Sequence, residues 1–189
     1  MKLLFLLLVA SQAIFGATFE SIAKSKEPHI KFNYPDAEWE VLPPRVEKEA
    51  AQQVDKSMAQ QTLVVIQRKQ ADEKYHARFH VVTDSLEKFN DPKVPVIVQY
   101  QKHVVDFLKN QRCMILSNEP IQLPNVKENA FEVTANQRDF GLKFKQVAFV
   151  HEGKAYILTA TARTEKFDSY KNDIKTIFDS FQFVEAGKK

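Results

Sequence analysis

Residues 141–181, GLKFKQVAFVHEGKAYILTATARTEKFDSYKNDIKTIFDSF, decide the fold because they contain two strand patterns followed by one helix pattern. Apolar residues alternate along Leu142–Val150, and apolar side chains also occur on the other face, so we expect a strand covered on both sides. The pair Glu152-Gly153 predicts a tight hairpin turn. Residues 155–162, AYILTATA, are β-branched and aromatic and predict the partner strand.

The second face of the first strand mixes lysines with apolar residues. The side chains that point this way are Lys143, Lys145, Val147, Phe149 and His151. Because neighbouring side chains of a strand lie on opposite faces, all of these residues share one surface of the sheet.

The end of the stretch has the period of an amphipathic helix. Its apolar positions are Phe167, Tyr170, Ile174, Ile177, Phe178 and Phe181, and polar or charged residues occupy the opposite side. An aromatic stripe can form a ligand box, but burying each such side chain stabilises a core by about 1.5–3 kcal/mol. We therefore expect the helix to pack these rings against the sheet.

The first 17 residues have the pattern of a secretory signal peptide: Lys2, then an apolar run over Leu3–Val9, then small residues. Cleavage after Ala13 fits best, and cleavage after Gly16 or Ala17 is an alternative. An uncleaved anchor is less consistent with the sequence, since the apolar run is well short of the roughly 20 residues of a spanning helix. We expect a periplasmic or secreted protein with no membrane span after leader cleavage.

The charges are nearly balanced and interspersed. The chain has 27 Lys and Arg and 24 Asp and Glu, and only Lys2 of these lies in the leader. Nucleic-acid binders usually have a clustered basic face, so the sequence implies neither nucleic acid nor an anionic membrane as a partner.

Cys113 is the only cysteine, so an intrachain disulfide is impossible, and it is too far from the leader to accept a lipid there. It begins an apolar run, which favours a buried structural thiol over a nucleophile.

The N-terminal half predicts short strands separated by polar segments. Residues 18–27 are polar and are interpreted as a linker or a frayed helical turn. Alternation predicts strands over 30–34 and 39–41, and we expect Trp39 to anchor the core. The charged segment Arg45–Gln61 has a thin apolar stripe, so it is either a weak helix or a mobile excursion.

The middle of the chain predicts a hairpin, a helix and two further strands. The hairpin strands are 62–66 and 76–83. Asp91-Pro92 can begin a helix, although Pro95 favours a start a few residues later. Prolines 120 and 124 indicate a loop or an edge strand, and 131–135 alternate as a strand. With no internal repeat, residues 28–184 are expected to form one domain, followed by a solvated tail at 185–189.

Chemical motifs are scarce. The chain lacks Gly-x-Ser-x-Gly, His-Glu-x-x-His and Cys-x-x-Cys motifs, and its four glycines leave little material for a phosphate loop. His76 and His80 could share a metal ion on a helix, but on a strand they lie about 13 Å apart. We therefore expect no enzyme activity and assign no catalytic, cofactor-binding or metal-binding residues.

Two other histidines and one aromatic residue need an interpretation. We expect His103 and His151 to be structural or solvated. Phe140 lies in a turn near Lys143 and Lys145, where an exposed ring could anchor a partner. Folding of this ring back onto the core is the preferred expectation.

The order of several segments resembles the PsbP-like superfamily, which includes photosystem II extrinsic proteins, Ran-binding Mog proteins and DcrB-like bacterial envelope proteins. The segments are IKFNYP (30–35), WEV (39–41), GKAYILTATA (153–162), FDSYK (167–171) and IFDSF (177–181). The resemblance covers residues 28–184, and the segment Arg45–Gln61 departs from it. It implies an α+β fold, an α/β/α sandwich with a central antiparallel sheet. It carries over no catalytic residue.

The resemblance also implies that the protein binds partners rather than catalysing a reaction. Our first hypothesis is a non-enzymatic accessory protein of the cell envelope that binds a protein or an envelope component through a sheet edge or loops. The alternative is a carrier of a small hydrophobic or metal ligand between sheet and helix, and a hydrolase comes third. The sequence leaves the partner and the oligomeric state open.

Overall fold

The computed structural model describes residues 16–21, 29–42 and 61–184. Seven antiparallel strands form the main sheet in the order β3-β4-β5-β9-β8-β7-β6. Their bounds are β3 (Trp39–Val41), β4 (Gln61–Arg68), β5 (Arg78–Ser85), β6 (Cys113–Ile121), β7 (Ala130–Gln137), β8 (Leu142–His151) and β9 (Lys154–Arg163).

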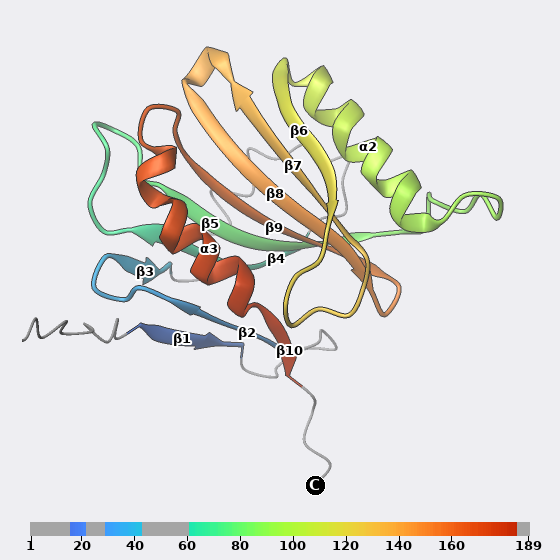
Figure 1. Cartoon of the computed structure of the whole chain (residues 1–189), viewed down its shortest axis with the longest axis horizontal. Helices are drawn as coiled ribbons and strands as arrows, with labels where there is room; N and C mark the ends of the chain where they lie inside the picture. Colours follow the sequence, from blue (N-terminus) through green and yellow to red (C-terminus); the bar gives the residue numbers. More distant parts are fainter. Residues whose placement is uncertain (1–15, 22–28, 43–60, 185–189) are drawn as a thin grey trace, which may run out of the picture.

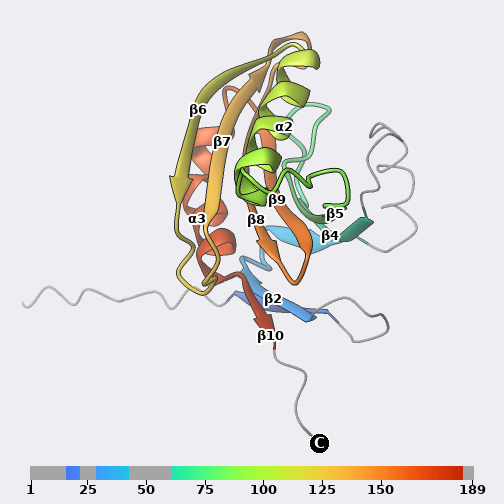
Figure 2. The same cartoon turned by 90° about the vertical axis from the view of Figure 1, so that its right-hand side faces the viewer.

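Helices cover both faces of this sheet. On one face, α2 (Val96–Asn110) packs on β6, β7 and β8. On the other, the 3₁₀ turn η2 (Phe167–Tyr170) leads into α3 (Lys171–Ser180), which also contacts β2. Figures 1 and 2 show the two helices on opposite sides of the strands. The predicted α+β fold, a helix–sheet–helix sandwich with an antiparallel sheet, is confirmed.

The predicted hairpin is formed by β8 and β9, which pair along their whole length from Leu142 opposite Arg163 to His151 opposite Lys154. Glu152 and Gly153 both have positive φ angles, 47° and 77°. Two consecutive residues of this kind give the turn a twist that matches the flanking strands.

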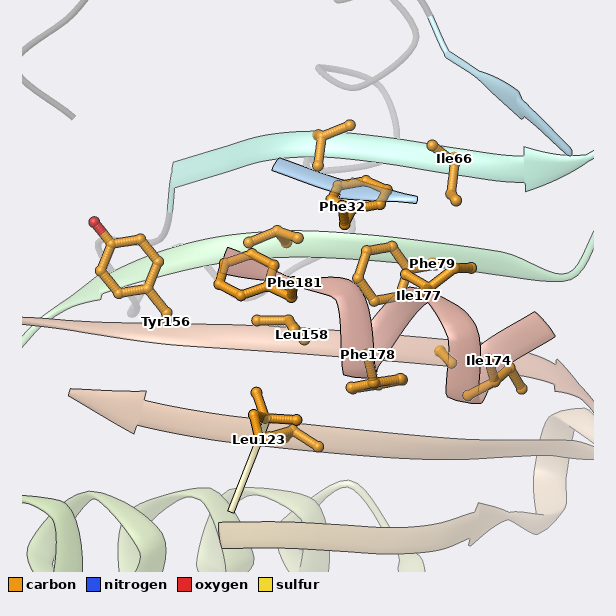
Figure 3. Packing of buried hydrophobic residues seen from close by; sticks show 14 of the residues in the cluster. Phe32, Ile66, Phe79, Leu123, Tyr156, Leu158, Ile174, Ile177, Phe178 and Phe181 are labelled. Atoms are coloured by element: carbon orange, nitrogen blue, oxygen red, sulfur yellow. The ribbon is translucent and has the colours of Figure 1, made fainter. Parts of the chain in front are cut away.

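The aromatic stripe lies in the core, as predicted. All six of its residues are buried, with exposed fractions between 0% and 7%. In Figure 3, Ile177 and Phe178 of α3 point toward the strands. The rings of Phe79 and Phe178 meet edge to face at 5.5 Å between centroids. The spacing of the apolar residues predicts a helix from Phe167 onward. In the structure Phe167–Tyr170 form a 3₁₀ turn, and the α-helix begins after it.

Trp39 is buried, as expected of a core anchor. Its indole Nε1 donates a hydrogen bond to the Asp173 carboxylate of α3 at 2.9 Å. Arg68 of β4 lies 3.6 Å from the same carboxylate and 2.6 Å from that of Glu38. These contacts fix α3 relative to the β3–β4 edge of the sheet.

A second sheet, unexpected from the sequence, has the order β1-β2-β10, with β1 (Ala17–Glu20), β2 (His29–Tyr34) and β10 (Gln182–Val184). The linker predicted over residues 18–27 is therefore wrong at residues 18–20, which belong to β1. A four-residue strand is too short for alternation to identify it. Its pairing with β2 comes from tertiary structure, with Phe19 stacked on Phe32 at 5.0 Å.

Of the two starts considered for the middle helix, the later one indicated by Pro95 is confirmed, and a start at Asp91-Pro92 is wrong. The first helical residue is Val96, and Pro95 is the N-cap. Asp91 instead accepts a hydrogen bond from the backbone amide of Lys93, which forms a local turn. β6 contains Pro120 and lies at the edge of the main sheet, which confirms the edge-strand alternative.

Several predictions lie outside the described residues. These are most of the leader, residues 22–27 of the linker, most of the segment Arg45–Gln61 and the tail. Within the described ranges, no helix is long and apolar enough to cross a membrane.

Candidate binding groove

A groove of about 610 Å³ lies between α3 and the strands at the β6 side of the main sheet. On one side α3 contacts β2, and on the other side it borders the groove together with residues of β7 and β8. The lining of the groove comes from the end of β6, from β7, β8, η2 and α3: Ile121, Gln122, Leu123, Glu132, Thr134, Lys143, Lys145, Val147, Phe167, Asp168, Lys171, Ile174, Lys175, Phe178 and Asp179.

The floor of the groove is apolar. Leu123, Val147, Ile174 and Phe178 line it and are each at most 5% exposed. They belong to the core cluster on the α3 side of the sheet, and Figure 3 shows Leu123 and Phe178 in it. The groove is thus an uncovered margin of the core rather than a separate chamber.

Strand register places the polar groups. Lys145 of β8 lies opposite Thr134 of β7, and Val147 lies opposite Glu132. All four residues line the groove. The alternation that places Lys143, Lys145 and Val147 on one face is the sequence signal that could have indicated this site.

The rim carries both signs of charge in ion pairs. Lys145 Nζ lies 2.7 Å from Glu132, and Lys143 Nζ lies 3.0 Å from Asp168. The Lys143 ammonium also lies 5.0 Å from the centre of the Phe167 ring, which favours it by a cation–π interaction. On α3, Lys175 pairs with Asp179. A ligand here would meet alternating charges above an apolar floor.

The two spaced histidines, His76 and His80, lie in different surroundings. Nδ1 of His76 lies 2.6 Å from the Arg68 carbonyl, outside β5. His80 lies within β5, where burial and then the nearby Arg78 charge lower its pKa to about 4. No cluster of three or more metal-ligating side chains occurs among the residues with described coordinates.

The expectation that Phe140 folds back onto the core is wrong: its side chain is 64% exposed. It ends the short helix η1 (Arg138–Phe140), which connects β7 to β8, and Gly141 follows in the left-handed conformation with φ 63°. The ring is therefore exposed at the turn between β7 and β8 instead of packing in the core.

The remaining candidates are structural. Cys113 is buried, as predicted, and burial raises the pKa of its thiol. His151 stacks on Phe183 with 3.7 Å between ring centres and bonds Glu128. His103 packs edge to face on Phe89.

Comparison with known families agrees with this architecture. The family model described as PsbP-like protein matches residues 11–183. The chain belongs to the PsbP-like family. No curated protein sequence matches it significantly.

Two solved structures share the PsbP-like fold. Cyanobacterial PsbP (CyanoP) from Synechocystis sp. PCC 6803 superimposes with a TM-score of 0.55 at 10% identity, over 93% of this chain and 96% of the other. LpqN of Mycobacterium tuberculosis, described as involved in cell envelope biogenesis, gives a TM-score of 0.58 at 14% identity, over 89% and 91%. At these identities the likeness concerns the fold alone.

Proposed function

We propose that this PsbP-like protein is exported and acts as a non-enzymatic binding protein of the cell envelope, with the groove beside α3 as its binding site. The leader pattern supports export. The fold shared with LpqN, which is described as involved in cell envelope biogenesis, supports the envelope. The observation that carries the proposal is the uncovered apolar floor with its rim of ion pairs.

The groove suits an extended polypeptide segment. Apolar side chains of the segment would cover the floor, while its polar groups would meet the charged rim. The groove also reaches the end of β6, the edge strand of the main sheet, and edge strands have backbone groups free to pair with an added strand.

The lining residues argue against hydrolysis. Among the described residues that line the groove there is no serine, cysteine or histidine, so they supply no nucleophile with an adjacent imidazole base. Its carboxylates Glu132, Asp168 and Asp179 each have a lysine partner.

Site-specific photo-crosslinking in the native envelope tests the proposal. A photoreactive residue at Thr134, in the groove, is expected to attach to one reproducible polypeptide. The same residue at Lys102, whose side chain is 80% exposed on α2 on the other side of the sheet, should not. Equal labelling from both positions, or none from Thr134, would contradict the proposal.

A second candidate function is the transport of a small hydrophobic ligand. The volume of the groove lies within the roughly 300–1,000 Å³ usual for such sites, and its floor is apolar. Native mass spectrometry of protein purified from its own host should then show an added mass that a variant with a bulky charged side chain in the groove, Thr134→Arg, lacks. Co-purification of no small molecule would remove this candidate.

A further inference from the structure

Two turns that are distant in sequence lie together at one end of the main sheet, shown at the top of Figure 1. The α2–β6 turn contains Arg112, and the β7–β8 turn contains Arg138 and Phe140. They are brought together by the β6–β7 register, in which Cys113 lies opposite Gln137. Nη2 of Arg138 lies 2.8 Å from Sδ of Met114. We call Lys109, Arg112, Met114, Arg138 and Phe140 the basic tip.

The basic tip combines exposed apolar groups with exposed cations, of which Lys109 lies close enough to Asp106 for its charge, after the hydrogen bond from Lys102, to lower the pKa of that carboxyl. Phe140 is 64% exposed and Met114 is 36% exposed. Lys109, Arg112 and Arg138 are exposed, and none forms an ion pair within the described part of the chain. Asp139 is the acidic residue of the β7–β8 turn. Some exposed cations elsewhere do have a carboxylate partner, as Lys102 has in Asp106.

We propose that the basic tip docks on an anionic lipid bilayer, with Phe140 inserted at the interface and the three cations against the headgroups. Aromatic rings favour the bilayer interface, and each cation near an anionic surface strengthens binding by about fivefold. Charge complementarity therefore selects an anionic surface over a neutral one.

The shape of the tip favours a bilayer over a protein surface. Protein hot spots sit at the centre of an interface, where surrounding contacts exclude water. Phe140 instead is 64% exposed and ends a turn that also contains Arg138 and Asp139. A fluid interface admits such a ring without a matching pocket. Because the cations come from two separate turns, the interspersed charges of the sequence do not reveal this cluster.

Vesicle binding of the full-length protein tests the proposal. Binding to vesicles of phosphatidylcholine with phosphatidylglycerol should exceed binding to phosphatidylcholine alone. It should weaken when salt shortens the Debye length from about 10 to about 3 Å. The double variant Arg112→Ser, Arg138→Ser is expected to lower the partition coefficient by about 10- to 30-fold, at about fivefold for each cation.

Matched controls distinguish binding through the basic tip from non-specific binding through any exposed apolar side chain. Val98 is also apolar and 48% exposed, but it lies near the opposite end of α2, so Val98→Ser should bind as the wild type does. The native Trp39 is buried, so in Phe140→Trp a fluorescence shift to shorter wavelength on anionic vesicles alone would report insertion.

Either of two results would overturn the proposal. One is that the wild type and all variants bind neutral and anionic vesicles equally. Binding of this kind would come from another part of the chain, such as the leader. The other is loss of an envelope protein partner by the tip variants while their vesicle binding stays unchanged, which would make the tip a protein-docking surface. Substitutions in the groove should leave vesicle binding intact, so this test is independent of the proposed function.

Discussion

At the scale of single residues, the least expected feature is the carboxylate of Asp84, which is only 3% exposed in β5. The hydroxyl of Tyr100, on α2, donates a hydrogen bond to it at 3.1 Å. Burial first, and then the Asp84 charge, raises the pKa of Tyr100, so the phenol stays a donor. This hydrogen bond attaches α2 to the sheet and fixes which side of the helix faces the strands.

Removing the donor should therefore destabilise the fold. Tyr100→Phe is expected to lower the free energy of unfolding by about 1–3 kcal/mol, because the Asp84 carboxylate would stay buried without its donor. Urea unfolding followed by circular dichroism measures this change. In an Asp84→Asn background the loss should be smaller, since a neutral amide costs less to leave unpaired. An equal loss in both backgrounds would contradict the pairing.

A second prediction for a single residue concerns acid. The folded-state pKa of His80 is about 4, below the ordinary value of 6.5. As pH falls from 6.5 toward 4 the unfolded chain binds a proton that the folded chain does not, so stability is lost by up to about 3 kcal/mol. His80→Asn should flatten the fall of urea midpoint with pH in this window. Some dependence of the urea midpoint on pH should remain in this variant, because the pKa of His103 is also lowered. If the dependence were unchanged, His80 would be excluded as a cause of the loss of stability in acid.

At the scale of elements, the sequence predicted a helix or a strand where the pattern of apolar residues was long enough. For a helix this meant more than about one turn, and for a strand about five residues. The sequence therefore indicated β8, β9 and the aromatic helix. For α2, Pro95 indicated the correct later start, whereas Asp91, the earlier candidate, forms a turn of its own. β1 was missed because its single large apolar residue, Phe19, acquires its role only from β2.

The β8–β9 turn provides a test at this scale. Gly153 has φ 77° and no atom within 4 Å of where a Cβ would stand, so Gly153→Ala meets no clash and only backbone strain. We expect a loss of about 1 kcal/mol in unfolding free energy. Glu152→Gly, at φ 47°, should be neutral or stabilising at the same turn. Equal effects of the two substitutions in thermal unfolding would be inconsistent with this turn geometry.

At the scale of the whole molecule, the groove shows what local patterns leave out. Alternation placed Lys143 and Lys145 on the same face as buried Val147, which indicates a face that is solvated at one end and buried at the other. How much of this face is covered depends on where α3 crosses the sheet. That position is set by contacts distant in sequence, such as Asp173 with Trp39 and the Ser180 hydroxyl with the Asn33 amide at 2.9 Å.

The small sheet gives the last prediction, because it joins both ends of the domain through β2. Phe19 is partly buried and stacks on Phe32, which itself packs edge to face on Phe79 of the main sheet at 5.3 Å. Phe19→Ala should lower the unfolding free energy by about 1–2 kcal/mol, a fraction of the value for full burial. Thr18→Ser keeps the hydroxyl that bonds Asn33 and serves as the control.

The same contacts bear on where the predicted leader would be cleaved if the protein is exported. Cleavage after Ala13 or Gly16 would keep β1 whole, and cleavage after Ala17 would remove only its first residue. Intact mass of the exported protein should therefore show a chain that retains Phe19. A mature chain that begins beyond Phe19 and unfolds at the same urea concentration as the longer form would show that β1 contributes nothing to stability. The stacking of Phe19 on Phe32 predicts the opposite, since its loss would expose a ring that the core buries completely.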